Sequence, residues 1–308
     1  MIKSLLVLVF ILTTIFNGVC QQAPLLTNFM FHRFNFNPGA TGIDDGISGA
    51  MIYRNQWDKI TGAPNTAFFN VEANLNKFTV GGAGITFMHD AIGSYKTNNV
   101  TLNYSYPFQI GEVGMVNVGL GVGIVNFSNN PDYITPTLNN NDAALIKPGS
   151  GSAMNMNFGV CWKSFKGLYS GISVTNLNKP VIRSMNSFQM YRTYYLMTGY
   201  KFANILGQGR DIECQLLVRS DILKTSADLN ALYYHSNLFY TGLTYRTTES
   251  ICFLAGFYPL KNTTIGYAYD LTINGLNTVS RGTNEIVLKY KYIIPEPPLE
   301  KSKHPRWL

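Results

Sequence analysis

The feature of this sequence that most restricts its fold is an alternation of apolar with small or polar residues, which recurs after residue 45. In one example, Val116, Val118, Leu120, Val122 and Ile124 alternate with Asn117, Gly119, Gly121 and Gly123. A period of two places the apolar side chains on one face of an extended strand. The same pattern recurs within 102–108, 154–162, 265–271 and 286–292, and helical spacing is hard to find. The chain is therefore predicted to be all-β.

Turn residues separate the alternating segments, which predict about fourteen strands, an even number within the range of bacterial outer-membrane barrels. The predicted strands are 46–56, 66–76, 78–89, 97–109, 113–126, 153–164, 167–176, 192–204, 210–220, 226–235, 238–247, 250–259, 262–272 and 283–293. Some connections are tight, such as Phe165-Lys166-Gly167, whereas 127–152 and 177–191 are long and polar. Tight periplasmic turns and longer outer loops are typical of such barrels, and a loop as long as 127–152 often carries function.

Low charge separates two all-β architectures, a transmembrane antiparallel β-barrel and a soluble β-sandwich. Charged residues make up 13% of the chain, about half the usual fraction of roughly 25%. A soluble sandwich needs charge on its outer faces, whereas here those faces carry Gly and Asn. Tyr and Phe are abundant near strand ends, as in the aromatic girdles of membrane barrels. These observations favour the barrel and predict residues 45–293 as its extent.

Residues 1–20 are predicted to be a cleaved secretory signal. Lys3 supplies a positive charge, residues 5–16 are mostly apolar, and Gly18 and Cys20 place small residues before Gln21. A lipoprotein signal acylated at Cys20 is the competing interpretation, which the bulky Val19 disfavours. Cleavage directs the chain to the outer membrane in this interpretation.

Several function classes are disfavoured by composition. Without Lys3 the formal charge falls from +7 to +6, and the basic residues are scattered, so nucleic-acid binding is not expected. Cys161, Cys214 and Cys252 form no CxxC pair, which argues against a disulfide framework or a zinc site. No stretch after residue 20 reaches the roughly 18 to 20 apolar residues of a membrane-spanning helix.

Residues 27–76, together with Gln21-Gln22, resemble the PorP/SprF family of outer-membrane proteins, which serve type IX secretion in Bacteroidota. The resemblance rests on Gln21-Gln22, Phe29-Met30-Phe31, Asn37-Pro38 with Gly42, the run Tyr53-Arg54-Asn55-Gln56-Trp57, and Gly62-Ala63-Pro64. Strand rhythm and length extend the resemblance over nearly the whole mature chain. Two departures lie in the pre-barrel segment: His32-Arg33-Phe34 stands where the family usually has an Asn-Pro pair, and Gly39 replaces a usual alanine.

The resemblance implies a non-enzymatic partner of the type IX machinery. Such proteins are expected to help export or retain a cargo protein, of the gliding or adhesion kind, that carries a C-terminal sorting domain. The implied partners are outer-membrane lipid, type IX secretion components and this cargo. A passive or solute-selective porin is the alternative function, and a soluble adhesin domain is a third.

The family motif has two interpretations. Tyr53, Arg54, Asn55, Gln56 and Trp57 either form a docking surface for a partner, or Arg54 pairs inside the lumen while Trp57 lies at the membrane interface. Gly62, Ala63 and Pro64 are better explained as a turn. Asn37, Pro38 and Gly42 belong to the pre-barrel part of the same motif.

The two ends of the mature chain are predicted to lie outside the barrel wall. Residues 21–44 are apolar and aromatic without alternation, and they are predicted to plug the lumen or to lie across the periplasmic mouth. The alternative is a partially ordered leader. Residues 294–308 are rich in Pro and basic residues, and they form either a solvated tail or a periplasmic contact through His304, Pro305, Arg306 and Trp307.

No catalytic, metal or cofactor site is expected. His89-Asp90 with Ser94 nearby is interpreted as a turn, and catalytic Ser/His or Asp/His arrangements are otherwise lacking. The run Gly81-Gly82-Ala83-Gly84 is interpreted as strand glycines at tight curvature, because no helix follows it as in a phosphate loop. Asp44-Asp45 is the only adjacent carboxylate pair, which is too few for a calcium site.

Overall fold

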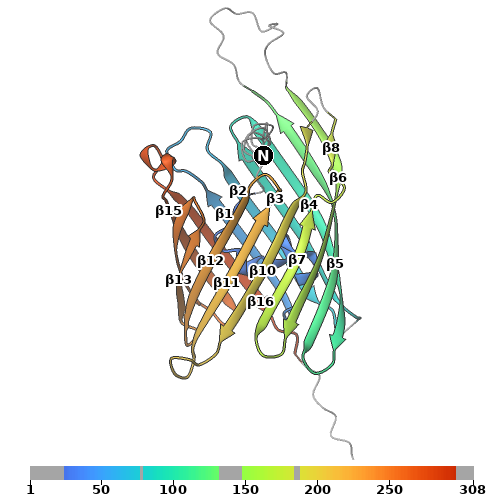
Figure 1. Cartoon of the computed structure of the whole chain (residues 1–308), viewed down its shortest axis with the longest axis vertical. Coiled ribbons are helices and arrows are strands. Elements are labelled where there is room, and N and C mark those ends of the chain that lie inside the picture. The colour runs from blue at the N-terminus through green and yellow to red at the C-terminus, as the bar shows by residue number, and fades with distance from the viewer. Residues whose placement is uncertain (1–23, 77–78, 132–147, 184–187, 296–308) are drawn as a thin grey trace, which may run out of the picture.

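The computed structural model describes residues 24–76, 79–131, 148–183 and 188–295, and fourteen strands of this part close into an antiparallel barrel (Figure 1). The strands are β1 (Ile47–Asn55), β2 (Asn65–Asn74), β3 (Gly82–Ile92), β4 (Tyr95–Ile110), β5 (Gly114–Asn129), β6 (Gly149–Ser164), β7 (Leu168–Thr175), β10 (Thr193–Phe202), β11 (Arg210–Ser220), β12 (Thr225–His235), β13 (Phe239–Arg246), β14 (Ser250–Phe257), β15 (Thr263–Thr272) and β16 (Thr283–Tyr292). The predicted all-β barrel is confirmed, and strand bounds differ from the prediction by a few residues at most.

The first and last strands of the barrel pair with each other. β1 and β16 run antiparallel from Ile47 opposite Tyr292 to Asn55 opposite Asn284. Every other strand pairs with its neighbours along the chain, with β7 and β10 adjacent. Closure matters because hydrocarbon offers no hydrogen-bond partner to a free strand edge.

The alternation predicted from sequence separates the outer face from the lumen. On the outer face, Leu102, Leu120 and Ile172 are about 60% exposed. Their neighbours on the lumen face, such as Asn103 and Ser105, are buried. An apolar outside and a polar, filled inside suit a barrel surrounded by lipid.

The two ends of the barrel differ in their connections (Figure 1). Both termini of the barrel, at Ile47 and Tyr292, lie at one end, which we call the turn end. The opposite end, called the loop end, carries the connections β1–β2, β5–β6, β7–β10 and β15–β16, the last of which contains the short helix η3 (Gly275–Thr278). Among the described residues, no helix is long and apolar enough to span a membrane.

Two predictions near the loop end need correction. The expected loop 127–152 is shorter, because β5 and β6 continue to pair as far as Asn129 opposite Gly149. The expected loop 177–191 contains two short strands, β8 (Val181–Ile182) and β9 (Phe188–Gln189), which pair with each other. Ile182 is buried against Val125 and Phe127, so this apolar contact holds the extension together.

The interpretation of His89-Asp90 as a turn is wrong. β3 continues to Ile92, and His89 and Asp90 pair with Asn98 and Thr97 of β4. The turn follows at Gly93 and Ser94. Sequence reasoning ended the strand too early because polar side chains that face a lumen resemble those of a turn.

Candidate functional site: the lumen and its inner segment

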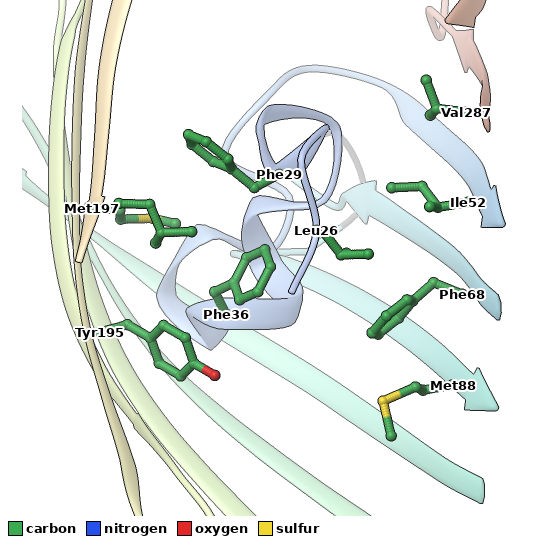
Figure 2. Packing of buried hydrophobic residues seen from close by; sticks show 10 residues of the cluster. Leu26, Phe29, Phe36, Ile52, Phe68, Met88, Tyr195, Met197 and Val287 are labelled. Carbon is green, nitrogen blue, oxygen red and sulfur yellow. The ribbon is translucent and has the colours of Figure 1, made fainter. Parts of the chain in front are cut away.

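Residues 24–44, here called the inner segment, lie inside the barrel (Figure 2). The segment contains three short helices, η1 (Phe29–Phe31), α2 (Arg33–Phe36) and η2 (Pro38–Ala40). Pro24 and Leu25 lie at the loop end, where they border a cavity with Trp57. Gly42 lies nearer the turn end, where its N–H donates to Glu72. The segment therefore runs along the lumen from one end toward the other.

Apolar side chains of the inner segment pack against apolar patches of the lumen wall. Leu26, Phe29 and Phe36 share one cluster with wall residues (Figure 2); those wall residues are Ile52, Phe68, Met88, Tyr195, Met197, Leu217 and Val287. Burial of each such side chain contributes about 1.5–3 kcal/mol. This packing accounts for the aromatic residues that the sequence places before the first strand.

A network of six buried charges lines one side of the lumen. Its members are Arg54, Arg219, Arg246, Asp228, Asp270 and Glu285, whose three positive and three negative charges balance. Arg54 lies 2.8 Å from the Asp270 carboxylate and 2.9 Å from that of Glu285. Arg246 joins Asp228 at 3.0 Å and Asp270 at 3.2 Å. Paired in this way, the charges avoid most of the cost of isolated burial.

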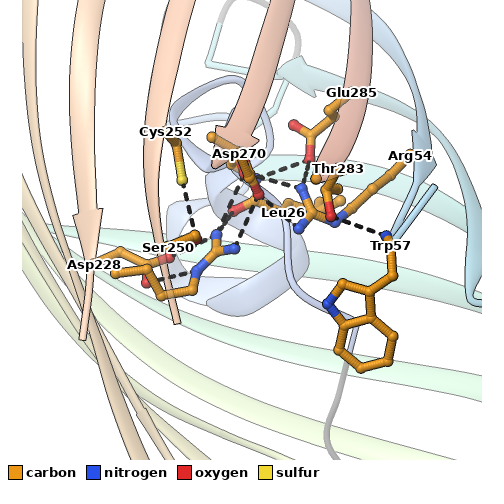
Figure 3. Close-up of polar contacts among 12 residues, drawn as sticks. Leu26, Arg54, Trp57, Asp228, Ser250, Cys252, Asp270, Thr283 and Glu285 are labelled. Atoms are coloured by element: carbon orange, nitrogen blue, oxygen red, sulfur yellow. Dashed lines mark hydrogen bonds and ion pairs between the residues drawn. The ribbon is translucent and has the colours of Figure 1, made fainter. Parts of the chain in front are cut away.

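This charge network binds the inner segment (Figure 3). The backbone N–H groups of Thr27 and Asn28 donate to the Glu285 carboxylate at 2.9 and 2.7 Å, and the Asn28 amide adds a third bond at 2.8 Å. The Thr27 hydroxyl donates to Asp270 and accepts from Arg54. Hydrogen bonds to charged groups are each worth about 1.5–3 kcal/mol, so this contact is a strong attachment.

A second attachment holds the other end of the inner segment. Asp44 accepts from Arg33 at 2.9 Å and from Lys163 at 2.7 Å. Although burial alone would raise the pKa of Asp44, these two cations lower it well below its usual range. Asp44 is consequently charged whenever the chain is folded near neutral pH.

His32 is the one buried histidine of the inner segment. Burial, aided by the Lys289 ammonium, lowers the pKa of His32 to about 3. Its Nδ1 contacts the side-chain amide of Asn70 on β2. The imidazole is therefore neutral at physiological pH and acts as part of the packing.

The pre-barrel motif residues contact the backbone of the lumen wall. The Asn37 amide donates to the carbonyl of Val160 on β6 at 3.0 Å and accepts from the N–H of Gly39. Pro38 is buried beside them. A Cβ atom on Gly39 would lie 2.8 Å from the Asn117 carbonyl, so glycine allows the segment to approach the wall closely.

The glycines at 81–84 also serve this close approach. Positions 82 and 84 face the inner segment, and a Cβ atom on Gly84 would lie 3.0 Å from the Phe34 ring. A Cβ atom on Gly82 would meet the Thr41 carbonyl. These glycines of β3 leave room for the segment, which gives a physical reason beyond strand curvature.

The motif residues 53–57 point in different directions. Tyr53 faces outward and is half exposed, whereas Arg54 is 1% exposed within the charge network. Asn55 ends β1, and its neighbour Gln56 is buried. Trp57 adopts a left-handed backbone conformation with φ 54°, and its backbone N–H donates to the Thr283 hydroxyl. The structure thus brings Arg54, Gln56 and Trp57 to the lumen and leaves Tyr53 on the outer face.

Gly62, Ala63 and Pro64 lie in the β1–β2 connection. Gly62 has φ 76°, which suits glycine, and the Pro64 carbonyl accepts from the N–H of Gln56 at 2.9 Å. The Ala63 N–H donates to the carbonyl of Ile60. These contacts describe a turn. The tail residues His304, Pro305, Arg306 and Trp307 lie outside the described residues, as does the predicted signal 1–20.

A cavity of about 790 Å³ remains at the loop end above the inner segment. Pro24, Leu25, Asn35 and Phe36 of the segment border it. The wall residues around it include Gln56, Trp57 and Pro64 of the motif together with many asparagines and threonines of β3 to β7. The lumen therefore has a filled part and a hollow part.

Sequence reasoning missed five of the six charges in the network. Arg219, Arg246, Asp228, Asp270 and Glu285 each occupy a buried, lumen-facing position in a strand. That pattern was the available signal, because a charge on the inward face of a barrel strand needs a partner. In the described ranges, no group of three or more His, Cys, Asp or Glu side chains is arranged to hold a metal ion.

Comparison with solved structures shows the fold. The chain is similar to the CymD monoaromatic hydrocarbon channel with a TM-score of 0.50 and 9% identity, over 86% of this chain and 93% of that one. It is also similar to a Pseudomonas aeruginosa FadL homologue with a TM-score of 0.48 and 10% identity, over 83% and 92% of the two chains. At 9% identity the likeness to the CymD channel shows the barrel fold alone, and nothing of what passes through it.

Comparison of sequences shows the family. No curated protein sequence matches this chain. The model of the type IX secretion system membrane protein family PorP/SprF, however, matches residues 19–290. That range includes the inner segment, the charge network and the whole barrel except its last residues. The chain therefore belongs to the PorP/SprF family of type IX secretion system membrane proteins.

Proposed function

We propose that this chain is a non-enzymatic outer-membrane component of type IX secretion that helps export or retain one cargo protein with a C-terminal sorting domain. Gliding or adhesion proteins are the kind of cargo expected. Family membership supports the export role. The observation that carries the choice against a general pore is the inner segment, which charge pairs and hydrogen bonds attach inside the lumen.

The orientation proposed for the barrel follows from its connections. The turn end, which holds both termini of the barrel, faces the periplasm, and the loop end faces outward. Cleavage after residue 20 then releases the mature chain into the periplasm. In this orientation the tail residues His304 to Trp307 are available to periplasmic machinery.

Two surfaces are proposed for partners. At the loop end, Trp57 and the turn Gly62-Ala63-Pro64 lie in the β1–β2 connection, and Trp57 and Pro64 border the cavity, so a cargo on the cell surface can contact them. The outward Tyr53 is suited to a membrane-embedded partner or to lipid, since it is half exposed on the outer face. Arg54 is assigned to the lumen network instead.

A pull-down from native outer membranes tests the export role. An epitope placed at Gly111, in the β4–β5 connection at the turn end, would meet no neighbour within 4 Å and lies away from both proposed partner surfaces. We expect type IX components and a protein with a sorting domain to copurify. Recovery of neither kind of protein from correctly folded bait would contradict the proposal.

Conductance measurements separate this role from the porin alternative. Intact protein in planar bilayers should conduct little, and deletion of residues 22–42 should raise conductance. High, solute-selective conductance of the intact chain would favour the porin. A deletion variant that assembles and conducts like the intact chain would remove the plug from the proposal. Truncation at Pro295 tests whether the tail contacts periplasmic machinery. Unchanged secretion and an unchanged pull-down would show that it is a solvated tail without such a contact.

A further inference from the structure

The lining of the loop-end cavity combines apolar and aromatic side chains with amides and hydroxyls, and it carries few charges. Amide and hydroxyl side chains of β3 to β7 make up one side, among them Asn99, Asn103, Asn155 and Asn157. Asp90, Lys224 and Glu249 are the charged residues among the described residues that border it. Amides donate and accept at once, so this lining suits a ligand that also does both.

Glycines on β5 leave room for two of these amides. Gly121 and Gly123 face the lumen between β4 and β6. A Cβ atom on Gly121 would crowd the amides of Asn103 and Asn157. The glycine at 121 therefore lets the amides of Asn103 and Asn157, which border the cavity, lie close to the β5 backbone.

Two amide atoms at the cavity are buried without a hydrogen-bond partner in the protein. Asn155 is only 2% exposed, yet its Oδ1 has none, and the Nδ2 of Asn35 in the floor also has none. Buried amide groups are nearly always paired, because an unmade bond costs about 1–3 kcal/mol. The unpaired Asn155 acceptor and the unpaired Asn35 donor thus indicate a ligand that both donates and accepts hydrogen bonds.

Aromatic rings border the same cavity. Tyr95, Phe127 and Phe188 form a stack at its outer part, with centroids 5.6 Å apart for the first pair and 4.0 Å for the second. Tyr195 lies deeper, and Trp57 lies near the charge network with its indole directed away from the paired charges (Figure 3). Flat aromatic faces complement the C–H faces of a ring-shaped ligand.

We propose that the loop-end cavity binds a neutral oligosaccharide. Sugar hydroxyls both donate and accept, which matches the amides, and sugar rings present C–H faces to the aromatic residues. The volume of about 790 Å³ lies within the usual range for small-ligand sites. The lining carries one cation and two carboxylates and so disfavours an anionic sugar. Extended peptides are the competing occupant that the test includes, because β8 and β9 beside the cavity form a two-stranded sheet outside the closed barrel.

Calorimetric titration of the full chain tests this site. The protein is held in a zwitterionic detergent without a sugar headgroup, and the probes are neutral di- to tetrasaccharides built from glucose, galactose, mannose or N-acetylglucosamine. Sulfated and uronic-acid oligosaccharides and neutral hexapeptides serve as comparison probes. We expect at least one neutral oligosaccharide to bind with a Kd between about 1 μM and 1 mM.

Three variants connect the binding to the cavity. Asn155→Leu removes the unpaired acceptor and should weaken binding at least about tenfold. Tyr95→Ala removes a ring that is 42% exposed, so it should fold normally and also weaken binding. Asn230→Ala is the matched control, since Asn230 is a buried lumen amide that does not border the cavity. Heat-modifiable electrophoretic mobility checks the folding of each variant.

Three outcomes would overturn the proposal. In the first, folded protein gives no heat of binding with any neutral oligosaccharide up to about 10 mM. In the second, the folded cavity variants bind the oligosaccharide as tightly as the parent does. In the third, only the hexapeptides bind. Conductance and pull-down report on the export role separately, so failure of one proposal is distinguishable from failure of the other.

Discussion

The two sides of the lumen hold the inner segment by different kinds of contact. On the side formed by β1 and β11 to β16, paired charges bind Thr27 and Asn28 through short hydrogen bonds. On the side formed by β4 to β7, glycines and neutral amides meet the segment mainly at Asn37 to Gly39. We call these the charged side and the amide side.

The difference shows how one barrel combines attachment with open space. A charge buried at low dielectric is stable only when an opposite charge or a hydrogen bond pairs with it. The charged side is therefore packed with the residues that form these pairs. Neutral amides tolerate water or an exchangeable ligand, so the amide side can remain partly hollow. The predictions below test this division.

The largest effect is expected on the charged side. Arg54→Met removes the cation that pairs with both Asp270 and Glu285. Leaving a buried carboxylate unpaired typically costs about 3–5 kcal/mol, and the unfolding free energy in urea should fall by that amount. Arg54→Lys, which retains the charge, should lose less. A change of under about 1 kcal/mol in Arg54→Met would show that the network does not hold the segment.

On the amide side, close approach should matter more than charge. Gly39→Ala places a Cβ atom 2.8 Å from the Asn117 carbonyl and as close to the Cys161 N–H. Overpacking of this kind costs about 1–3 kcal/mol, which the same urea titration measures. Gly275→Ala is the matched control, because a Cβ atom there meets nothing within 4 Å. Equal stability of Gly39→Ala and the parent would mean that the segment sits farther from this wall.

Acid should weaken the attachment through His32, which contacts β2 between the two sides. Its folded pKa of about 3 lies below the ordinary histidine value of 6.5, so the unfolded chain binds the proton more readily. Stability is therefore retained above pH 6.5 and falls as the pH drops toward 3, by about 1.4 kcal/mol per unit.

His32→Gln isolates this contribution. Between pH 6.5 and 5 the parent should lose up to about 2 kcal/mol more than the variant, measured by urea unfolding at each pH. Parallel pH profiles of parent and variant would show that the imidazole is not buried in its neutral form.

The smallest effect is expected where charge is only partly buried. Asp44→Asn breaks the pairs with Arg33 and Lys163, whose side chains are about 20–40% exposed. Such pairs contribute about 0–1 kcal/mol, so stability should change little and should depend on salt. A loss as large as that in Arg54→Met would contradict the contrast between buried and half-exposed charge.

The sequence by itself determined the barrel. Alternation in segments such as 116–124 specifies which face of each strand is apolar, and lipid accepts only a closed sheet with that face outward. The motif around Asn37 and Tyr53 to Trp57 also indicated the family that the family comparison then established.

Only the tertiary structure decided which inward residues meet. Arg54 and Glu285 are 231 positions apart, and their pairing depends on the closure of β1 against β16. The hollow beside Asn155 likewise depends on where the inner segment stops along the lumen. Local periodicity reports the face on which a side chain lies, whereas partners across a lumen are set by the packing of the whole chain, which no local pattern encodes.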